Sequence, residues 1–129
     1  MSATPPPSYA RVLDTEALER LRALDPSGAN GLLDRVLATF RGSLLRLIPQ
    51  MRDGRHVGDA SAVRHVAHTL KSSSASVGAL RLSQLCAEVE QALRQDGGGL
   101  ASLDARLDEL LDEAERLLAV LPAEGQRAP

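Results

Sequence analysis

The sequence predicts an all-α fold, an antiparallel four-helix bundle with a short additional N-terminal helix. Hydrophobic residues make up 43% of the chain but aromatic residues only 2%, so the core must be aliphatic, which favours helices over sheets. Apolar residues recur at helical spacing through most of the chain. Short turns containing Gly and Asp separate these stretches, and helices of similar length joined in this way bury their apolar stripes against one another as a bundle.

The chain has the size of one domain. Its 129 residues leave little room for a second core. Residues 1–10 are rich in proline, and residues 122–129 show no apolar periodicity, so we expect both ends to be disordered tails. The helical bundle is therefore predicted to span residues 11–121.

The N-terminal half is predicted to hold a short helix and a long one. Asp14 is a plausible N-cap for the short helix, which stops near the "DPSG" of residues 25–28. Pro49 is expected to kink or fray the last turns of the long helix. The "RDGRHVGD" of residues 52–59 is then predicted to break the chain, which places His56 in a loop. The apolar stripe of the long helix comprises Leu33, Val36, Leu37, Phe40, Leu44, Leu47 and Met51.

Three further helices are predicted in the C-terminal half. The first covers residues 59–77 and ends at Gly78, which suits a left-handed stop. The next runs to the "DGGG" of residues 96–99, and its stripe comprises Leu82, Leu85, Cys86, Val89 and Leu93. The stripe of the last helix comprises Leu103, Leu107, Leu110, Leu111, Ala114, Leu117, Leu118 and Leu121.

Charge and cysteine content exclude several classes of protein. Fifteen Lys and Arg residues against seventeen Asp and Glu residues give a net charge of −2, which is not the basic excess that nucleic acids require, so no nucleic-acid ligand is expected. Cys86 cannot form an internal disulfide, and its place on an apolar stripe predicts a core residue. No apolar run is long enough for a membrane span or a signal peptide, so we expect a cytoplasmic protein without membrane association.

The stretch "HVAHTLKSSSASVGA", residues 65–79, is polar where a central helix is expected to show leucines. Winding the segment at about 100° per residue places Val63, Val66, Leu70 and Val77 opposite His68. His68 is therefore predicted to face water. Its neighbours on the exposed face are basic or small, namely Arg64, His65, Lys71, Ser72, Ala75 and Ser76.

This exposed face suits a phosphoryl-accepting histidine. An imidazole in water titrates near neutrality and can present a neutral nitrogen nucleophile. Lys71 lies one turn along and supplies positive charge where a phosphoryl group on His68 would sit. Small side chains at Ser72, Ala75 and Ser76 leave a shallow area for the loops of another protein. No set of acid, base or metal completes a catalytic site beside the imidazole, so we interpret His68 as a substrate group offered to a partner.

The stretch "AHTLKSSSASVGALRLSQLCAEVE", residues 67–90, resembles the signature of histidine phosphotransfer (HPt) domains of multistep two-component phosphorelays. In that signature a leucine, a lysine and a small residue stand two, three and four positions after a histidine. A glycine follows, and then a helix in which a leucine, together with a cysteine or a second leucine, faces the core. The family usually has glycine directly after the lysine, where this chain has Ser72, also a small residue. The positions in register are His68, Leu70, Lys71, Gly78, Leu82, Leu85 and Glu90.

The resemblance implies a function, partners and site residues. His68 would be the phosphoacceptor, exchanging the phosphoryl group with aspartates of response-regulator receiver domains downstream of a hybrid sensor histidine kinase. The receiver would supply the catalytic groups and a Mg²⁺ ion, while this chain, expected to be a monomer, would hold no cofactor or metal. Lys71 and Arg64 would offset phosphate charge. The receiver-docking surface would comprise His65, Ser72, Ala75 and Ser76.

Two alternatives stay open. A metal-binding bundle could use His65 and His68 at i, i+3 spacing, although no third ligand is visible at matched spacing. A docking adaptor could bind receivers without phosphotransfer. The dimerisation hairpin of a sensor kinase is disfavoured, because Lys71 is third after the histidine and no acidic residue follows it directly. An autokinase is excluded, since no nucleotide-binding domain is present.

Overall fold

The computed structural model describes residues 13–96 and 100–123, and every regular element within these ranges is helical. The all-α prediction is therefore confirmed for the described residues. Residues 1–10 and 124–129 of the predicted tails lie outside them. In chain order the elements are α2 (Thr15–Ala23), α3 (Leu32–Val57), α4 (Ala60–Ser76), α5 (Leu80–Asp96), the short 3-10 helix η1 (Leu100–Leu103) and α6 (Asp104–Val120).

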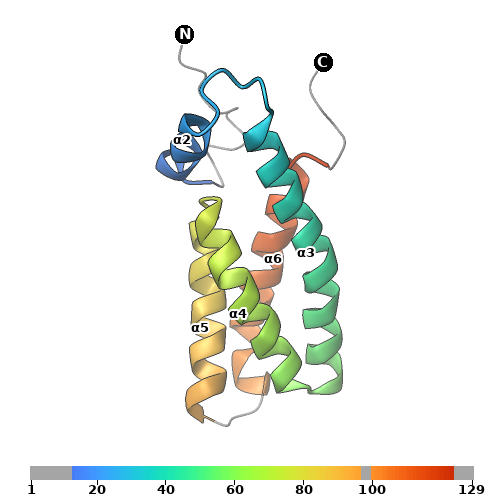
Figure 1. The fold of residues 1–129 in the computed structure, drawn as a ribbon. Coiled ribbons are helices and arrows are strands. Elements are labelled where there is room, and N and C mark those ends of the chain that lie inside the picture. Colours follow the sequence, from blue (N-terminus) through green and yellow to red (C-terminus); the bar gives the residue numbers. More distant parts are fainter. Residues whose placement is uncertain (1–12, 97–99, 124–129) are drawn as a thin grey trace.

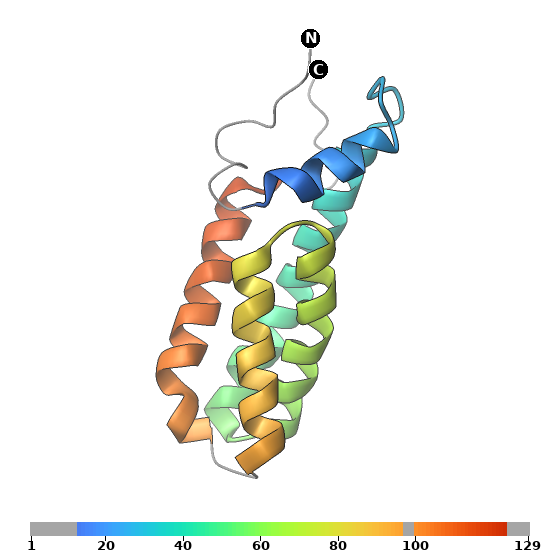
Figure 2. The same ribbon diagram turned by 90° about the vertical axis from the view of Figure 1, so that its left-hand side faces the viewer.

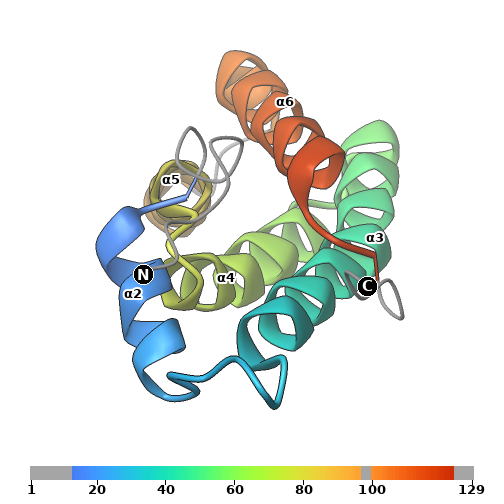
Figure 3. The same ribbon diagram turned by 90° about the horizontal axis from the view of Figure 1, so that it is seen from above.

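The long helices α3, α4, α5 and α6 lie side by side, and each runs opposite to the one before it (Figures 1 and 2). The shorter α2 lies across one end of this group, beside the turn between α4 and α5 (Figure 3). The core is aliphatic, as the composition predicts. None of the described helices combines the length and hydropathy needed to cross a membrane. The largest fully buried side chains include Leu18, Leu37, Leu44, Met51, Leu70, Leu82, Leu107, Leu110 and Leu117.

The α4–α5 turn fixes α2 in place. Asp14 caps α2 as predicted, since its carboxylate accepts the backbone N–H of Ala17 at 3.1 Å. The Asp14 backbone N–H donates to the carbonyl of Gly78 at 2.7 Å. Gly78 has a φ of +84°, and a Cβ built there would lie 2.9 Å from Cβ of Ala17. Any other residue at this turn would therefore be strained and would push α2 away.

The end of α3 differs from the prediction. The helix continues through Pro49 to Val57, so residues 52–57 are helical and His56 lies in the last turn rather than in a loop. Proline in a helix interior costs about 3 kcal/mol, from a missing hydrogen bond and a clash of its ring with the preceding turn, so the contacts of the last turns must offset this cost. Met51 is fully buried, and Gly54 approaches α4 so closely that a Cβ would lie 3.1 Å from Cβ of Ala62.

Candidate functional site

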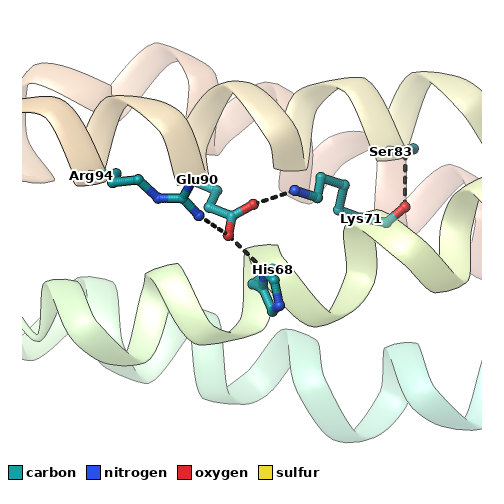
Figure 4. A network of polar contacts seen from close by, with 5 residues as sticks. All are labelled: His68, Lys71, Ser83, Glu90 and Arg94. Atoms are coloured by element: carbon teal, nitrogen blue, oxygen red, sulfur yellow. Dashed lines mark hydrogen bonds and ion pairs between the residues drawn. The ribbon is translucent and has the colours of Figure 1, made fainter.

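Helix α4 presents His68 to solvent. Val63, Val66 and Leu70 are buried against the bundle, whereas 64% of the His68 side chain is exposed. The prediction that His68 faces water is therefore confirmed. Because α4 packs along α5, the imidazole lies at the edge where these two helices meet, within reach of side chains from both (Figure 4).

Small side chains on α4, several of them serines, leave the surface beside His68 without protruding groups. The hydroxyl of Ser76 donates to the carbonyl of Ser72 at 3.1 Å, and the hydroxyl of Ser73 donates to the carbonyl of Thr69 at 3.3 Å. Hydroxyls bonded back onto their own helix need no outside partner. Ser72 and Ser76 are exposed, as is Ala75 between them, so small groups cover the C-terminal half of the exposed face.

A buried carboxylate holds the imidazole. Glu90 of α5 is only 5% exposed, and its Oε2 lies 2.6 Å from Nδ1 of His68. The same Oε2 accepts a hydrogen bond from Nη2 of Arg94 at 2.9 Å, and Oε1 accepts one from Nζ of Lys71 at 2.7 Å. The hydroxyl of Ser83 bonds the backbone carbonyl of Lys71 at 2.8 Å. Figure 4 shows these groups on one side of the ring, and the second ring nitrogen pointing away from Glu90.

This network determines which nitrogen of His68 can react. The hydrogen bond from Lys71, more than that from His68, lowers the pKa of Glu90 from 4.5 to about 2, against an opposing effect of burial. At neutral pH Glu90 is therefore an ionised carboxylate that can only accept hydrogen bonds. Nδ1 of His68 must donate, so the neutral imidazole carries its proton there and keeps a lone pair on Nε2.

The carboxylate that orients the imidazole is a feature that the sequence analysis does not predict. Sequence reasoning placed Glu90 in the signature without giving it a role, and it missed Arg94 altogether. A signal was present, because Glu90 falls on the apolar stripe of its helix next to Val89 and one turn after Cys86. A carboxylate on a buried stripe needs charged or hydrogen-bonding partners. The basic and imidazole groups of the neighbouring helix were the nearest candidates.

A surface pocket of about 300 Å³ lies beside the imidazole toward the N-terminus of α4. Its basic lining includes the exposed side chains of Arg64 and His65, so the structure brings both predicted residues to the site. Lys71 lies on the Glu90 carboxylate instead, with 37% of its side chain exposed. The full lining is Ser61, Arg64, His65, His68, Glu90 and Arg94.

Two other candidates for chemistry are explained by the structure. Cys86 is a buried free thiol, and burial, with a smaller effect of the Glu90 charge, raises its pKa to about 12. It is thus the core residue that its position predicts, because a thiol that stays protonated is a poor nucleophile. Within the described residues, no group of three or more His, Cys, Asp or Glu side chains is placed to hold a metal ion. The metal-binding alternative at His65 and His68 is therefore not supported.

Comparisons with known proteins agree with this geometry. A family model described as "Hpt domain" matches residues 35–120. The structure is similar to the crystal structure of histidine-containing phosphotransfer protein B (HptB) from Pseudomonas aeruginosa PAO1. The TM-score is 0.72 and the sequence identity 25%, over 87% of this chain and 92% of that one. A search of curated proteins gave no match.

Proposed function

Because the chain belongs to the Hpt domain family and is a histidine phosphotransfer protein of a phosphorelay, we propose that His68 carries the phosphoryl group. The observation that best supports the choice of His68 is the way its ring is held. The imidazole is exposed while its Nδ1 is held 2.6 Å from a buried carboxylate, which leaves the lone pair of Nε2 directed at solvent. The scaffold would be an antiparallel four-helix bundle with α2 across its end, formed by residues 11–121.

Transfer would proceed by direct displacement at phosphorus. The Nε2 lone pair of His68 attacks the phosphorus of an aspartyl phosphate on the receiver. The new N–P bond forms as the bond from phosphorus to the aspartate oxygen breaks, and the electron pair leaves with the receiver's carboxylate. Because Nδ1 keeps its proton, the ring becomes cationic, and the Glu90 carboxylate stabilises this charge. In the reverse step the ring takes the electron pair back as it loses the phosphoryl group.

The basic residues around the ring would offset the charge of the phosphoryl group. Lys71 contributes from its position on Glu90, and Arg64 faces the pocket beside the ring. Coulomb attraction acts over several ångströms at a protein surface, so neither cation needs a direct contact in the unphosphorylated state. Both would matter most once the phosphoryl group is in place.

The remaining machinery would belong to the partner. A receiver domain brings a magnesium-bearing acidic pocket, and the chain's contribution is the oriented nucleophile and a surface open enough to dock. That docking surface would comprise His65, Ser72, Ala75 and Ser76, all of them exposed. The partners would be response-regulator receivers and a hybrid sensor histidine kinase. We propose a cytoplasmic monomer that holds no cofactor and binds no nucleic acid.

The test is phosphate uptake by His68→Gln. Phosphorylated receiver domains from the same genome, and potassium phosphoramidate as a small donor, should label the wild-type chain with an acid-labile phosphate and leave His68→Gln unlabelled. Helical content and melting temperature should hardly change, because an exposed side chain contributes little to stability. His56→Gln changes another exposed histidine, on α3, and should label normally. Equal labelling of His68→Gln and wild type would refute the assignment.

A further inference from the structure

The site contains a third cation, Arg94, besides Lys71 and Arg64, the two residues proposed to offset the charge of the phosphoryl group. Arg94, one turn after Glu90 on α5, pairs with Oε2 of that carboxylate at 2.9 Å and lines the pocket beside His68. It lies on the solvent side of the network, since 62% of its side chain is exposed against 5% for Glu90. Arg94 is thus an i,i+4 partner on the same helix, added to a carboxylate that Lys71 and His68 already bind.

The two oxygens of Glu90 are bound unequally. Within the described residues, Lys71 is the sole donor to Oε1, whereas Oε2 accepts from both His68 and Arg94. If Lys71 left, a buried charged oxygen would lose its partner, and this is costly. If Arg94 left, Oε2 would keep the bond from His68. Arg94 is therefore the partner that Glu90 can release at the lower cost.

Arg94 is also close enough to reach a phosphoryl group on the ring. Its Nη2 and the Nδ1 of His68 bond the same oxygen at 2.9 and 2.6 Å, distances that add to 5.5 Å, the greatest separation these contacts allow between the two nitrogens. A phosphoryl group on Nε2 extends from the opposite edge of the same ring into solvent. An exposed arginine side chain has the length and rotational freedom to move there, and its planar donors match phosphate oxygens in pairs.

On the basis of the proposed function, we propose that Arg94 is the mobile cation of the site. It pairs with Glu90 while His68 is free and moves onto the phosphoryl oxygens once His68 is phosphorylated. The movement breaks one ion pair and forms another, so no net charge is left without a partner. Lys71 meanwhile stays on Oε1 and keeps Glu90, and through it the imidazole, in place. Arg94 thereby protects the N–P bond, because a bound guanidinium shields the group from water and opposes its loss.

The first measurement compares lifetimes. The full chain is phosphorylated with potassium phosphoramidate, the donor is removed, and loss of acid-labile phosphate is followed at pH 7.5. We expect Arg94→Gln to shorten the half-life by about threefold to tenfold, which is the size of effect that one charge-assisted contact produces, and Arg94→Lys to restore part of it. Arg81→Gln is the matched control, since Arg81 also lies on α5, is 58% exposed and pairs instead with Glu109 of α6. Its half-life should equal that of wild type.

The second measurement observes the movement in the wild-type protein. The side-chain ¹⁵N–¹H signals of Arg94 and Lys71 are recorded before and after phosphorylation. We expect a change at the Arg94 guanidinium and a smaller change at Nζ of Lys71. A large change at Lys71 with none at Arg94 would assign the mobile role to Lys71, and an unchanged half-life in Arg94→Gln would also refute the proposal. Failure of the underlying function is distinguishable, because His68 would then take up no phosphate in any variant.

Discussion

Two ionic clusters at different edges of the bundle use opposite arrangements. Around Glu90, one buried carboxylate receives hydrogen bonds from His68, Lys71 and Arg94. Around Arg55, one guanidinium donates to exposed carboxylates, with Nη1 at 2.8 Å from Asp108 and Nη2 at 3.2 Å from Asp104. The second cluster joins the end of α3 to the start of α6. Each has a central charge held by several partners of the opposite kind.

The two clusters differ in whether they hold a group with a free lone pair. An arginine guanidinium stays protonated in proteins, and the hydrogen bond to Asp108, more than that to Asp104, raises the pKa of Arg55 further. The Glu90 cluster ends in an imidazole with a lone pair on the nitrogen that faces solvent. Ion pairing alone therefore does not mark a functional site. What separates the Glu90 cluster from the Arg55 cluster is that it orients an imidazole with a free lone pair.

The largest expected effect comes from adding a bulky side chain beside His68. The same side chain added beside the Arg55 cluster serves as the control. Ala75→Trp, or Ser72→Arg, should cut transfer from a phosphorylated receiver by roughly 100-fold, because small losses of in-line positioning are that expensive. Ala105→Trp places the same bulk on an exposed position of α6 between Asp104 and Asp108 and should transfer normally. Labelling by phosphoramidate should survive in all three variants. If Ala75→Trp and wild type exchange phosphate equally fast, the docking surface lies elsewhere.

The next effect comes from neutralising one carboxylate in each cluster. Glu90→Gln should slow phosphorylation of His68 by about 10- to 100-fold, the range found when a carboxylate that orients a metal-bound histidine is lost. Asp108→Asn removes a charge from the Arg55 cluster and should leave the rate unchanged. Both rates are measured with phosphoramidate, which requires no docking. Similar rates for the two variants would show that the Glu90 carboxylate does not assist phosphorylation of His68.

A smaller effect is expected from removing one cation. Lys71→Ala should slow transfer and shorten the lifetime of phosphorylated His68 by about fivefold, which corresponds to about 1 kcal/mol, the attraction between two unit charges about 4 Å apart in water. Affinity for the receiver should change less, because the charge acts mainly when phosphate is present. Arg55→Ala is the counterpart in the other cluster and should affect stability alone. Transfer by Lys71→Ala at the wild-type rate would contradict the role given to Lys71.

The smallest effect concerns stability in acid. The pKa of Glu90 is lowered from 4.5 to about 2 in the folded protein, so ionised Glu90 stabilises the fold above pH 4.5, and this contribution is lost as the pH falls toward 2. Urea unfolding at pH 7 should show Glu90→Gln to be less stable than wild type by roughly 1 to 2 kcal/mol. The difference in unfolding free energy between wild type and Glu90→Gln should decrease steadily as the pH is lowered. A gap that stays constant between pH 7 and 3 would show that the Glu90 charge does not stabilise the fold.

Much of the fold follows from the sequence because aliphatic periodicity and capping residues act locally. Asp14 and Gly78 mark a helix start and a helix stop in the structure, as they do in the sequence. The end of α3 could not be predicted, because the local signals of Pro49 and Gly54 favour a break. The contacts that extend the helix join residues distant in the chain, such as Arg55 and Asp108.

The candidate site was predictable on one helix and not across two. Periodicity along α4 is enough to place His68 and Lys71 on its exposed face. Glu90 and Arg94 come from α5, and their approach to His68 depends on how far α5 is shifted along α4 when the two pack. That register is set by buried contacts and by the turn at Gly78, so it cannot be derived from the pattern of either helix alone.

The α4–α5 hairpin also has a consequence for the order in which the protein assembles. Among the described residues, the side chains that hold the imidazole come from this hairpin, with separations along the chain of 22 residues from His68 to Glu90 and 19 from Lys71 to Glu90. Closing loops of this size costs little chain entropy, and contacts between near neighbours form early in folding. During synthesis all of these residues precede α6, so the groups around His68 can find one another before the last helix of the bundle has been made.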